Sequence, residues 1–402
     1  MTQSELAAQQ KRTFRLELLR SIPQGVIETA GTTFAMYVAI RVFDAPVSVK
    51  ILIAVASSIG LLLSLFSVQL VRRLGYSVNI ASMVVWSLAA LGFMVSAMAS
   101  QWQTLYMIGV CIAAIMMTLG VPLMSQIYRK HYSNEVRGRL FSYGGVVRAS
   151  SSALAGIFIG SWLAKQGDAY HGVFWLYAVS CLIMATCVFF MAEVKLRKAS
   201  QLKLFDAFSH VSEDKPFRKL LITWMILGLG NLLCMALFVE YITNPEYGYS
   251  LSADKAGWLT TTIPMLAYVL CVVPWGMVFD KLPFYRLRVL VNAFFILGVL
   301  CYYLGGSYLF LCIGMVFYGV GRAGGNVLWS LWVTRFASED RVGEYMSVHT
   351  CLTGFRGTLA PVISFSIVGV VGPSVVAIIG ASLMVLSSLL LMPEVIRESR
   401  SS

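Results

Sequence analysis

A single arginine interrupts an apolar stretch that is long enough to cross a membrane. Residues 309–333 read LFLCIGMVFYGVGRAGGNVLWSLWV, and Arg322 lies near the middle of them. An apolar helix of this length spans a hydrocarbon core of about 30 Å. A cation at that depth costs from about 2.5 to more than 10 kcal/mol. Arginine presents a planar fork of donors that matches a carboxylate or a phosphate. The stretch therefore predicts a polar chamber inside a helix bundle and an anionic ligand for the guanidinium.

Polar and aromatic residues recur at helical spacing around this arginine. Tyr318, Arg322, Asn326 and Trp329 are separated by four, four and three residues, so they share one face of a helix. We predict that this face contacts a substrate. Asn231, in a second apolar stretch, either hydrogen-bonds the same substrate or bridges two helices, and the spacing favours neither.

Three further charged residues lie inside apolar stretches, namely Glu28, Arg148 and Arg356. Either arginine can contact an anionic ligand or pair with an acid. Burial raises the pKa of a carboxyl group, so Glu28 is a candidate proton site. The alternative is a permanent ion pair, with Arg148 as the partner. Three arginines against one acid leave the interior short of negative charge, which favours an anionic substrate accompanied by protons.

The composition indicates an all-α polytopic membrane protein surrounded by the lipid bilayer. Hydrophobic residues make up 58% of the chain and charged residues 12%, whereas soluble domains carry about 25% charged residues. We predict twelve transmembrane helices, at residues 18–42, 50–70, 78–98, 105–127, 141–164, 172–192, 220–242, 256–279, 289–304, 309–333, 345–370 and 375–392.

The basic residues predict the topology and the domains. Most of the 31 lysines and arginines fall in loops on the face that holds the N-terminus. The positive-inside rule then places both termini in the cytoplasm of a cell whose inner membrane holds the protein. The same pattern explains the net charge of +12 without nucleic acid as a partner. We expect one six-helix bundle over residues 1–192, a cytoplasmic loop over 193–219 and a second bundle over 220–402.

The sequence carries no pattern typical of an enzyme, a cofactor or a metal. The eight cysteines form no CxxC pair. Gly319, Gly321 and Gly324 spell GxGxxG, but no strand precedes them, so we interpret them as helix-packing positions. Neither a nucleophile–base pair nor a metal-ligand cluster is evident.

Short loop motifs point to a family. Gly276, Asp280 and Lys281 fit G-x-x-x-D-[RK] after the eighth predicted span, and Arg137 to Arg139 read R-G-R after the fourth. With twelve spans in two sixes and a basic central loop, the whole chain resembles the major facilitator superfamily of secondary transporters. The resemblance implies two bundles that rock about a central cavity lined by the first, fourth, seventh and tenth helices. It is this resemblance that places Arg322 and Glu28 at the centre.

The resemblance also implies residues that act in the conformational change and a functional monomer. Charge contacts that break and re-form as the bundles rock would involve Asp280, Lys281, Arg137 and Arg139. The basic members can equally serve only to orient the chain. The case is strongest for Asp280, because the positive-inside rule does not need an acid there.

The sequence thus predicts a secondary active transporter working by alternating access. The predicted substrate is a small organic anion, such as a carboxylate, a sugar acid or a phosphorylated metabolite, moved in symport with protons. The alternative is an efflux transporter for amphipathic or cationic compounds, in which Glu28 would attract the cation.

Overall fold

The computed structural model describes residues 3–166, 169–196, 208–331 and 342–401. Within these ranges the chain is helical apart from loops and one isolated antiparallel bridge between Ser77 and Lys195. Contacts divide it into two compact units, residues 1–202 with 252–257 and residues 203–251 with 258–402. The division at a cytoplasmic loop 193–219 stays a prediction, since part of that loop lies outside the described ranges.

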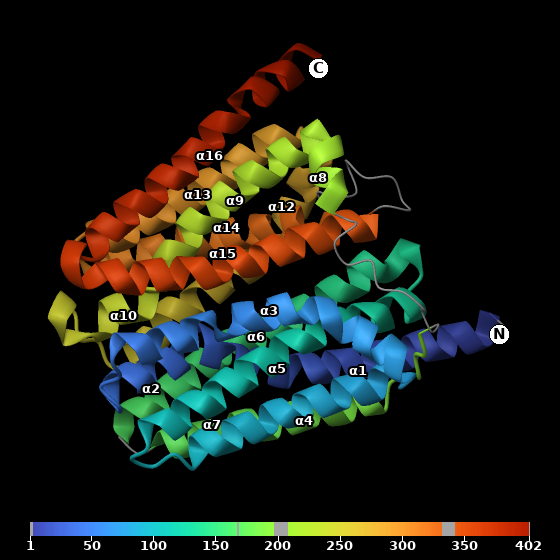
Figure 1. Cartoon of the computed structure of the whole chain (residues 1–402), viewed down its shortest axis with the longest axis horizontal. Coiled ribbons are helices and arrows are strands. Elements are labelled where there is room, and N and C mark those ends of the chain that lie inside the picture. Colours follow the sequence, from blue (N-terminus) through green and yellow to red (C-terminus); the bar gives the residue numbers. More distant parts are fainter. Residues whose placement is uncertain (1–2, 167–168, 197–207, 332–341, 402) are drawn as a thin grey trace. The chain divides into compact units, whose positions relative to one another are not determined.

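Unit 1 is a bundle of long helices (Figure 1). Its elements are α1 (Gln3–Thr29), the π-helix η1 (Ala30–Phe34), α2 (Ala35–Arg41), α3 (Val47–Leu74), α4 (Val78–Ala97), α5 (Gln103–His131), α6 (Asn134–Lys165), α7 (Tyr170–Phe189) and the short α11 (Ala253–Gly257). In this bundle α1 packs against α6 and α7, α4 packs against α5 and α7, and α3 packs against α5. The arrangement places α1 inside its unit.

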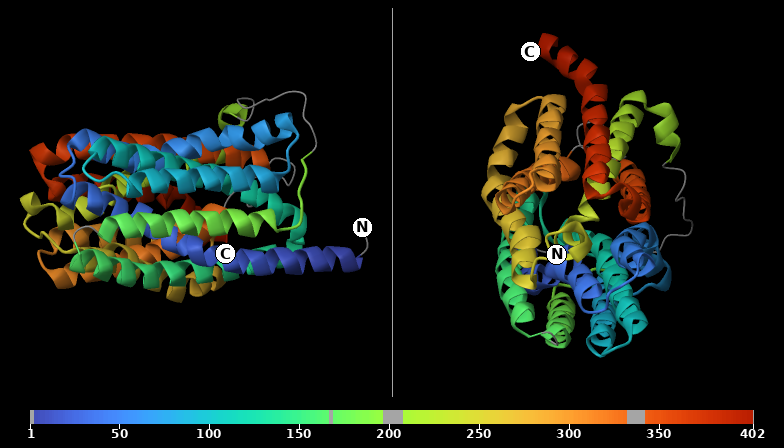
Figure 2. Two further views of the ribbon diagram at one scale, coloured as in Figure 1. Left: turned by 90° about the horizontal axis from the view of Figure 1, so that it is seen from below. Right: turned by 90° about the vertical axis from the view of Figure 1, so that its left-hand side faces the viewer.

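Unit 2 has the same kind of architecture. Its elements are α8 (Ser209–Glu213), α9 (Lys215–Met235), α10 (Phe238–Thr243), the 3-10 helix η4 (Pro245–Tyr247), the π-helix η5 (Trp258–Thr262), α12 (Ile263–Lys281), α13 (Phe284–Leu304), α14 (Tyr308–Leu331), α15 (Val342–Val371) and α16 (Pro373–Ser401). Here α14 packs against α12 and α13, while α9 packs against α15 and α16. The further views in Figure 2 show the long helices of each unit running alongside one another.

Local sequence signals explain where several helices start and stop. The Ser77 hydroxyl accepts the Ile80 N–H at the start of α4, and the Asp214 carboxylate accepts the Phe217 N–H at the start of α9. Both are standard N-cap contacts. At the end of α3, Gly75 adopts φ of 75°, a left-handed conformation that glycine accepts at little cost.

Eleven of the described helices are long and apolar enough to cross a membrane. The predicted first span, 18–42, is not among them, since its helix carries polar side chains such as Ser21, Gln24 and Glu28. Its helix is nevertheless present as α1, η1 and α2 in succession. The all-α, polytopic class predicted from the sequence is confirmed, and the twelve-span count is consistent with it.

The first and seventh predicted spans are both irregular near their middle. The π-helix η1 follows directly after Glu28 and Thr29, and the seventh span breaks at Ala236 and Leu237 between α9 and α10. Single π-helical turns are frequent at functional sites. The irregular turn in unit 1 therefore coincides with the predicted proton site.

Candidate functional site

The four residues predicted to share a face of the tenth span do so on α14, and we call them the α14 stripe: Tyr318, Arg322, Asn326 and Trp329. Tyr318 is buried and the other three are half-buried. The Nδ2 of Asn326 donates a hydrogen bond of 2.9 Å to the hydroxyl of Tyr268 on α12.

A third helix contributes to the same place, because Tyr318 lies next to both Arg322 and Asn231 of α9. Three helices of unit 2 thus bring a guanidinium, two amides and two phenols together. A small number of convergent polar groups in otherwise apolar surroundings is typical of a site that orients a small ligand.

Glycines next to the stripe bring α12 close to α14. A Cβ atom at Gly319 would come within 2.8 Å of the Cα of Pro264, and one at Gly324 within 2.8 Å of the Trp275 ring. The indole Nε1 of Trp275 donates to the Val320 carbonyl at 2.9 Å. The GxGxxG run is therefore a helix-packing surface, as interpreted from the sequence.

A second group of cationic and aromatic side chains lies in unit 2, and we call it the Trp224 cluster: Trp224, Arg288, Arg356 and His349. The Cζ of Arg288, on α13, lies 3.5 Å from the centroid of the Trp224 ring on α9. The Nη1 of Arg356, on α15, donates to the backbone carbonyl of Trp224. The His349 ring meets the Trp224 ring edge-on, with centroids 5.1 Å apart. Two arginines from different helices thus converge on one tryptophan.

Both arginines of the cluster are removed from solvent, since Arg288 is 2% exposed and Arg356 is 7% exposed. Gly228 makes room for one of them, because a Cβ atom there would overlap the Arg356 guanidinium. The Nη2 of Arg288 and the Nε of Arg356 are buried and lack a hydrogen-bond partner within the described ranges.

Among the described residues, neither arginine of this cluster takes part in an ion pair. The ion pairs of unit 2 within the described part of the chain are Lys219–Glu394 and Arg397–Glu394, both on other residues. The buried acid Glu240 lies on α10, beyond the break at the end of α9, and its Oε1 accepts a hydrogen bond from the Nδ2 of Asn244. As far as the structure describes it, the Trp224 cluster therefore lacks a counter-charge, and burying a charge without one is costly.

Unit 1 pairs Glu28 with Arg148. The Nη1 of Arg148 on α6 lies 3.3 Å from the Oε2 of Glu28 on α1, and the two side chains are 30% and 15% exposed. Close packing of the helices holds the pair, because a Cβ atom at Gly25 would lie 2.8 Å from the backbone N of Ser152. The ion pair that the sequence left as one alternative is present, and its partial exposure leaves the carboxylate accessible to protons.

A second ion pair in unit 1 was missed from the sequence. Arg20 donates from Nε and Nη2 to the two carboxylate oxygens of Glu17, at 2.8 and 2.7 Å, and from Nη2 to the Tyr128 hydroxyl at 3.0 Å. Its Cζ lies 5.1 Å from the centroid of the Trp86 ring. The predicted span began at residue 18, whereas α1 begins at Gln3 and carries this pair into the bundle. The i, i+3 spacing of an acid and a base ahead of the apolar run was the available signal.

The structure describes the side chains of two of the four residues that were predicted to act in conformational gating. Lys281 and Arg139 are exposed. The side chains of Arg137 and Asp280 lie outside the described residues, so the predicted charge contacts stay predictions. Within the described part of the chain, no group of three or more His, Cys, Asp or Glu side chains is placed to hold a metal ion.

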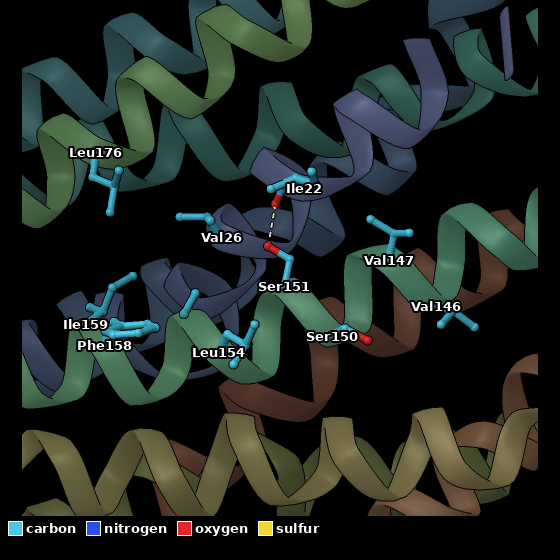
Figure 3. Close-up of a pocket in the computed structure, with 11 residues that line it drawn as sticks. Ile22, Val26, Val146, Val147, Ser150, Ser151, Leu154, Phe158, Ile159 and Leu176 are labelled. Atoms are coloured by element: carbon cyan, nitrogen blue, oxygen red, sulfur yellow. Dashed lines mark hydrogen bonds between the residues drawn. The ribbon is translucent and has the colours of Figure 1, made fainter. Parts of the chain in front are cut away.

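A groove lies on α1, α6 and α7 of unit 1 (Figure 3) and has a volume of about 550 Å³. Its lining is apolar except for Ser150 and Ser151, and the hydroxyl of Ser151 donates to the Ile22 carbonyl at 2.7 Å. Leu154 and Phe158 form part of its exposed wall. The groove suits a hydrocarbon or aromatic group rather than a charged one.

Comparisons with known proteins agree on the family and the fold. The family model described as Major Facilitator Superfamily matches residues 25–253 and 235–402. The solved nucleoside transporter NupG is 14% identical, with 96% of this chain and 98% of that chain covered and a TM-score of 0.73. The human organic anion transporter MFSD10 (TETRAN) is 15% identical, with coverage of 95% and 99% and a TM-score of 0.68. A D-xylose-proton symporter is 16% identical, with 96% of each chain covered and a TM-score of 0.61.

No curated protein matches the sequence significantly. At these identities the solved structures show the fold alone, whereas the family model covers essentially the whole chain. The protein is therefore an integral, multi-pass membrane transporter of small molecules, and it belongs to the major facilitator superfamily.

Proposed function

We propose that the protein is a secondary transporter that moves a small organic anion by alternating access, in symport with protons. The observation that carries this proposal is the α14 stripe, in which a guanidinium lies among amide and phenol groups near the middle of a membrane-spanning helix. A guanidinium fork matches a carboxylate, sugar acid or phosphate group in shape and charge.

Each residue of the stripe has a distinct proposed role. Arg322 binds the charged group of the substrate, Tyr318 and Asn326 accept or donate hydrogen bonds, and Trp329 stacks on its carbon skeleton. Asn231 extends the polar surface from α9. Arg356 is a second anion contact, and it is linked to the stripe because His349 contacts both Trp224 and Trp329, at 5.1 and 5.9 Å between ring centroids.

Glu28 and Arg148 supply the proposed coupling to protons. When Glu28 takes up a proton it loses its charge, and its Coulomb attraction to Arg148 disappears. The pair is held between α1 and α6, beside the irregular turn η1. Proton binding therefore loosens two helices of unit 1 at the position where α1 is already irregular. We further propose that the working form is a monomer in a cytoplasmic membrane, with both termini in the cytoplasm.

A thermal-unfolding screen of the purified protein tests this proposal. The panel contains organic acids, phosphorylated metabolites, sugars and cationic drugs, because a ligand that binds only the folded state raises the melting temperature. We expect one anionic class to stabilise the wild type and Arg322→Ala to abolish that shift. Arg397→Ala serves as the control, since that side chain is 78% exposed at the end of α16. Stabilisation by cationic or neutral compounds alone would refute the anion proposal.

A second candidate function is the export of amphipathic or cationic compounds, and the apolar groove of unit 1 favours it. Such a compound would place its hydrocarbon part against Leu154 and Phe158, with Glu28 attracting its positive charge. The same panel separates the two functions. Under this alternative, cationic drugs shift the melting temperature, and Phe158→Ala reduces the shift while Arg322→Ala does not.

A further inference from the structure

We infer that Arg288 and Arg356 form an anion-binding site inside unit 2 that takes a compact oxyanion, namely a carboxylate or phosphate group. The site is organised around Trp224, which contacts Arg288 through its ring and Arg356 through its backbone carbonyl. The inference rests on the proposed function only where the bound oxyanion is part of the transported substrate.

The charges of the two arginines favour a bound anion. Arg288 and Arg356 both contact Trp224, one at its ring and the other at its backbone carbonyl, and both are more than nine-tenths buried. No ion pair in the described ranges neutralises either of them. Two like charges kept out of water require a counter-charge, and an anion from solution supplies it.

Each of the two guanidiniums also keeps an N–H donor that can bind an anion. The Trp224 ring occupies the face of the Arg288 guanidinium, and stacking on a face leaves the N–H donors in the guanidinium plane. The buried Nη2 of Arg288 and the buried Nε of Arg356 have no partner among the described residues. Two guanidiniums with unused donors match the several acceptor oxygens of one carboxylate or phosphate.

The local packing keeps the Arg356 side chain in place. Gly228 lies against the Arg356 guanidinium, on the same helix as Trp224 and one turn further along. A larger residue at that position would displace the guanidinium. The glycine, the tryptophan and the arginine therefore pack against one another, and this packing fixes the position of the guanidinium.

The test is thermal unfolding of the purified full-length protein in a zwitterionic buffer of low ionic strength. Sodium phosphate is added in one series and sodium chloride in a parallel series at the same ionic strength. General charge screening is then equal in both series, so a difference between them reports specific binding of phosphate. We expect a saturable rise of the melting temperature with phosphate, and its loss in Arg288→Met and in Arg356→Met. Arg397→Met is the matched control and keeps the full response. A wild type that shows no phosphate-specific rise, or an Arg288→Met variant that keeps it, would overturn the inference.

The starting stability gives a second readout. Without anion, Arg288→Met removes a buried charge that has no counter-charge, so its melting temperature should equal or exceed that of the wild type. If the role of Arg288 were purely structural, Arg288→Met would melt at a lower temperature than the wild type, and the melting temperature of the wild type would not depend on phosphate. If Arg288→Met does not fold, Arg288→Lys decides instead. It keeps the charge but loses the planar fork, and should need about tenfold more phosphate for half the shift, since each lost 1.4 kcal/mol is tenfold in affinity.

Two further series of measurements identify the kind of oxyanion that binds. They also test the anion site separately from the proposed function. Mono- and dicarboxylates replace phosphate in one series, and the anionic class found in the substrate screen is used in the other. If Arg322→Ala loses the substrate shift but keeps the phosphate response, the site and the proposed function both stand. A phosphate response that depends on Arg288, without any substrate shift at Arg322, would leave the site in place and refute the proposed function alone.

Discussion

The two units differ in whether their buried and half-buried arginines form ion pairs. In unit 1, Arg20 pairs with Glu17 and Arg148 pairs with Glu28. In unit 2, no ion pair within the described ranges involves Arg288 or Arg356. The first unit carries its own counter-charges, whereas the second lacks them around Trp224. We therefore expect unit 2, rather than unit 1, to obtain negative charge from a ligand.

Each unit also contains a contact between an arginine and a tryptophan ring. In unit 1 the cation is Arg20 on the first spanning helix, and the ring is Trp86 on the third, α4. In unit 2 the ring is Trp224 on the seventh, α9, and the cation is Arg288 on the ninth, α13. The two units thus place the same kind of contact between corresponding helices with the roles exchanged. The acid Glu17 is on the helix of its arginine, and α13 offers no such acid to Arg288.

The largest expected effect is on the fully neutralised pair of unit 1. Glu17→Gln leaves Arg20 buried with a hydroxyl partner but no counter-charge, and breaking such a pair costs about 3–5 kcal/mol of unfolding free energy. Thermal unfolding and the yield of folded protein measure this. The double variant Glu17→Gln with Arg20→Met should recover most of the loss. A Glu17→Gln variant as stable as the wild type would break the contrast between the units.

At the partly exposed pair of unit 1, we expect a small effect on stability and a larger effect on transport. Glu28→Gln keeps the side-chain size but removes the charge, so the stability should fall by only about 1 kcal/mol or less, as for pairs near solvent. Its consequence for transport should be larger, because Gln cannot take up a proton. Uptake measured across a pH series should lose its proton dependence. Undiminished dependence in Glu28→Gln would remove this residue from the coupling mechanism.

A more selective effect is expected at the glycine of unit 2. Gly228→Ala displaces the Arg356 guanidinium, while the gain in helix propensity of about 1 kcal/mol offsets part of the repacking cost. We expect little change in melting temperature and a weaker response to phosphate. Gly369→Ala on α15 is the control, because nothing lies within 4 Å of a Cβ atom there. Equal phosphate responses in both variants would argue against a role of Arg356 in binding the anion.

The smallest effect is expected at a surface pair of unit 2. Lys219 and Glu394 are 2.5 Å apart, with side chains 42% and 16% exposed. Lys219→Ala should lower the unfolding free energy by about 1 kcal/mol at most, and high salt should reduce the difference. A loss comparable to that of Glu17→Gln would show that burial is not what separates the ion pairs of the two units.

Spacing along the sequence was sufficient for the α14 stripe and for the helical class. Residues three and four apart share a helix face whatever the surroundings, so Tyr318, Arg322 and Asn326 could be grouped without a structure. The same reasoning missed Arg288, which follows the start of α13 by four residues and looks like a loop cation that sets topology. Which side chain meets it depends on how α9 and α13 pack, and no local pattern contains that information.

Uptake into liposomes that contain the purified protein tests the central claim most directly. The labelled compound is the anionic class that stabilises the wild type, and Arg322→Ala is compared with Arg397→Ala. Anion transport centred on the α14 stripe predicts that Arg322→Ala loses at least about tenfold in uptake, as expected for losing one charged hydrogen bond of about 1.5–3 kcal/mol. Arg397→Ala should match the wild type. Equal uptake by Arg322→Ala, or competition by cations alone, would contradict the account.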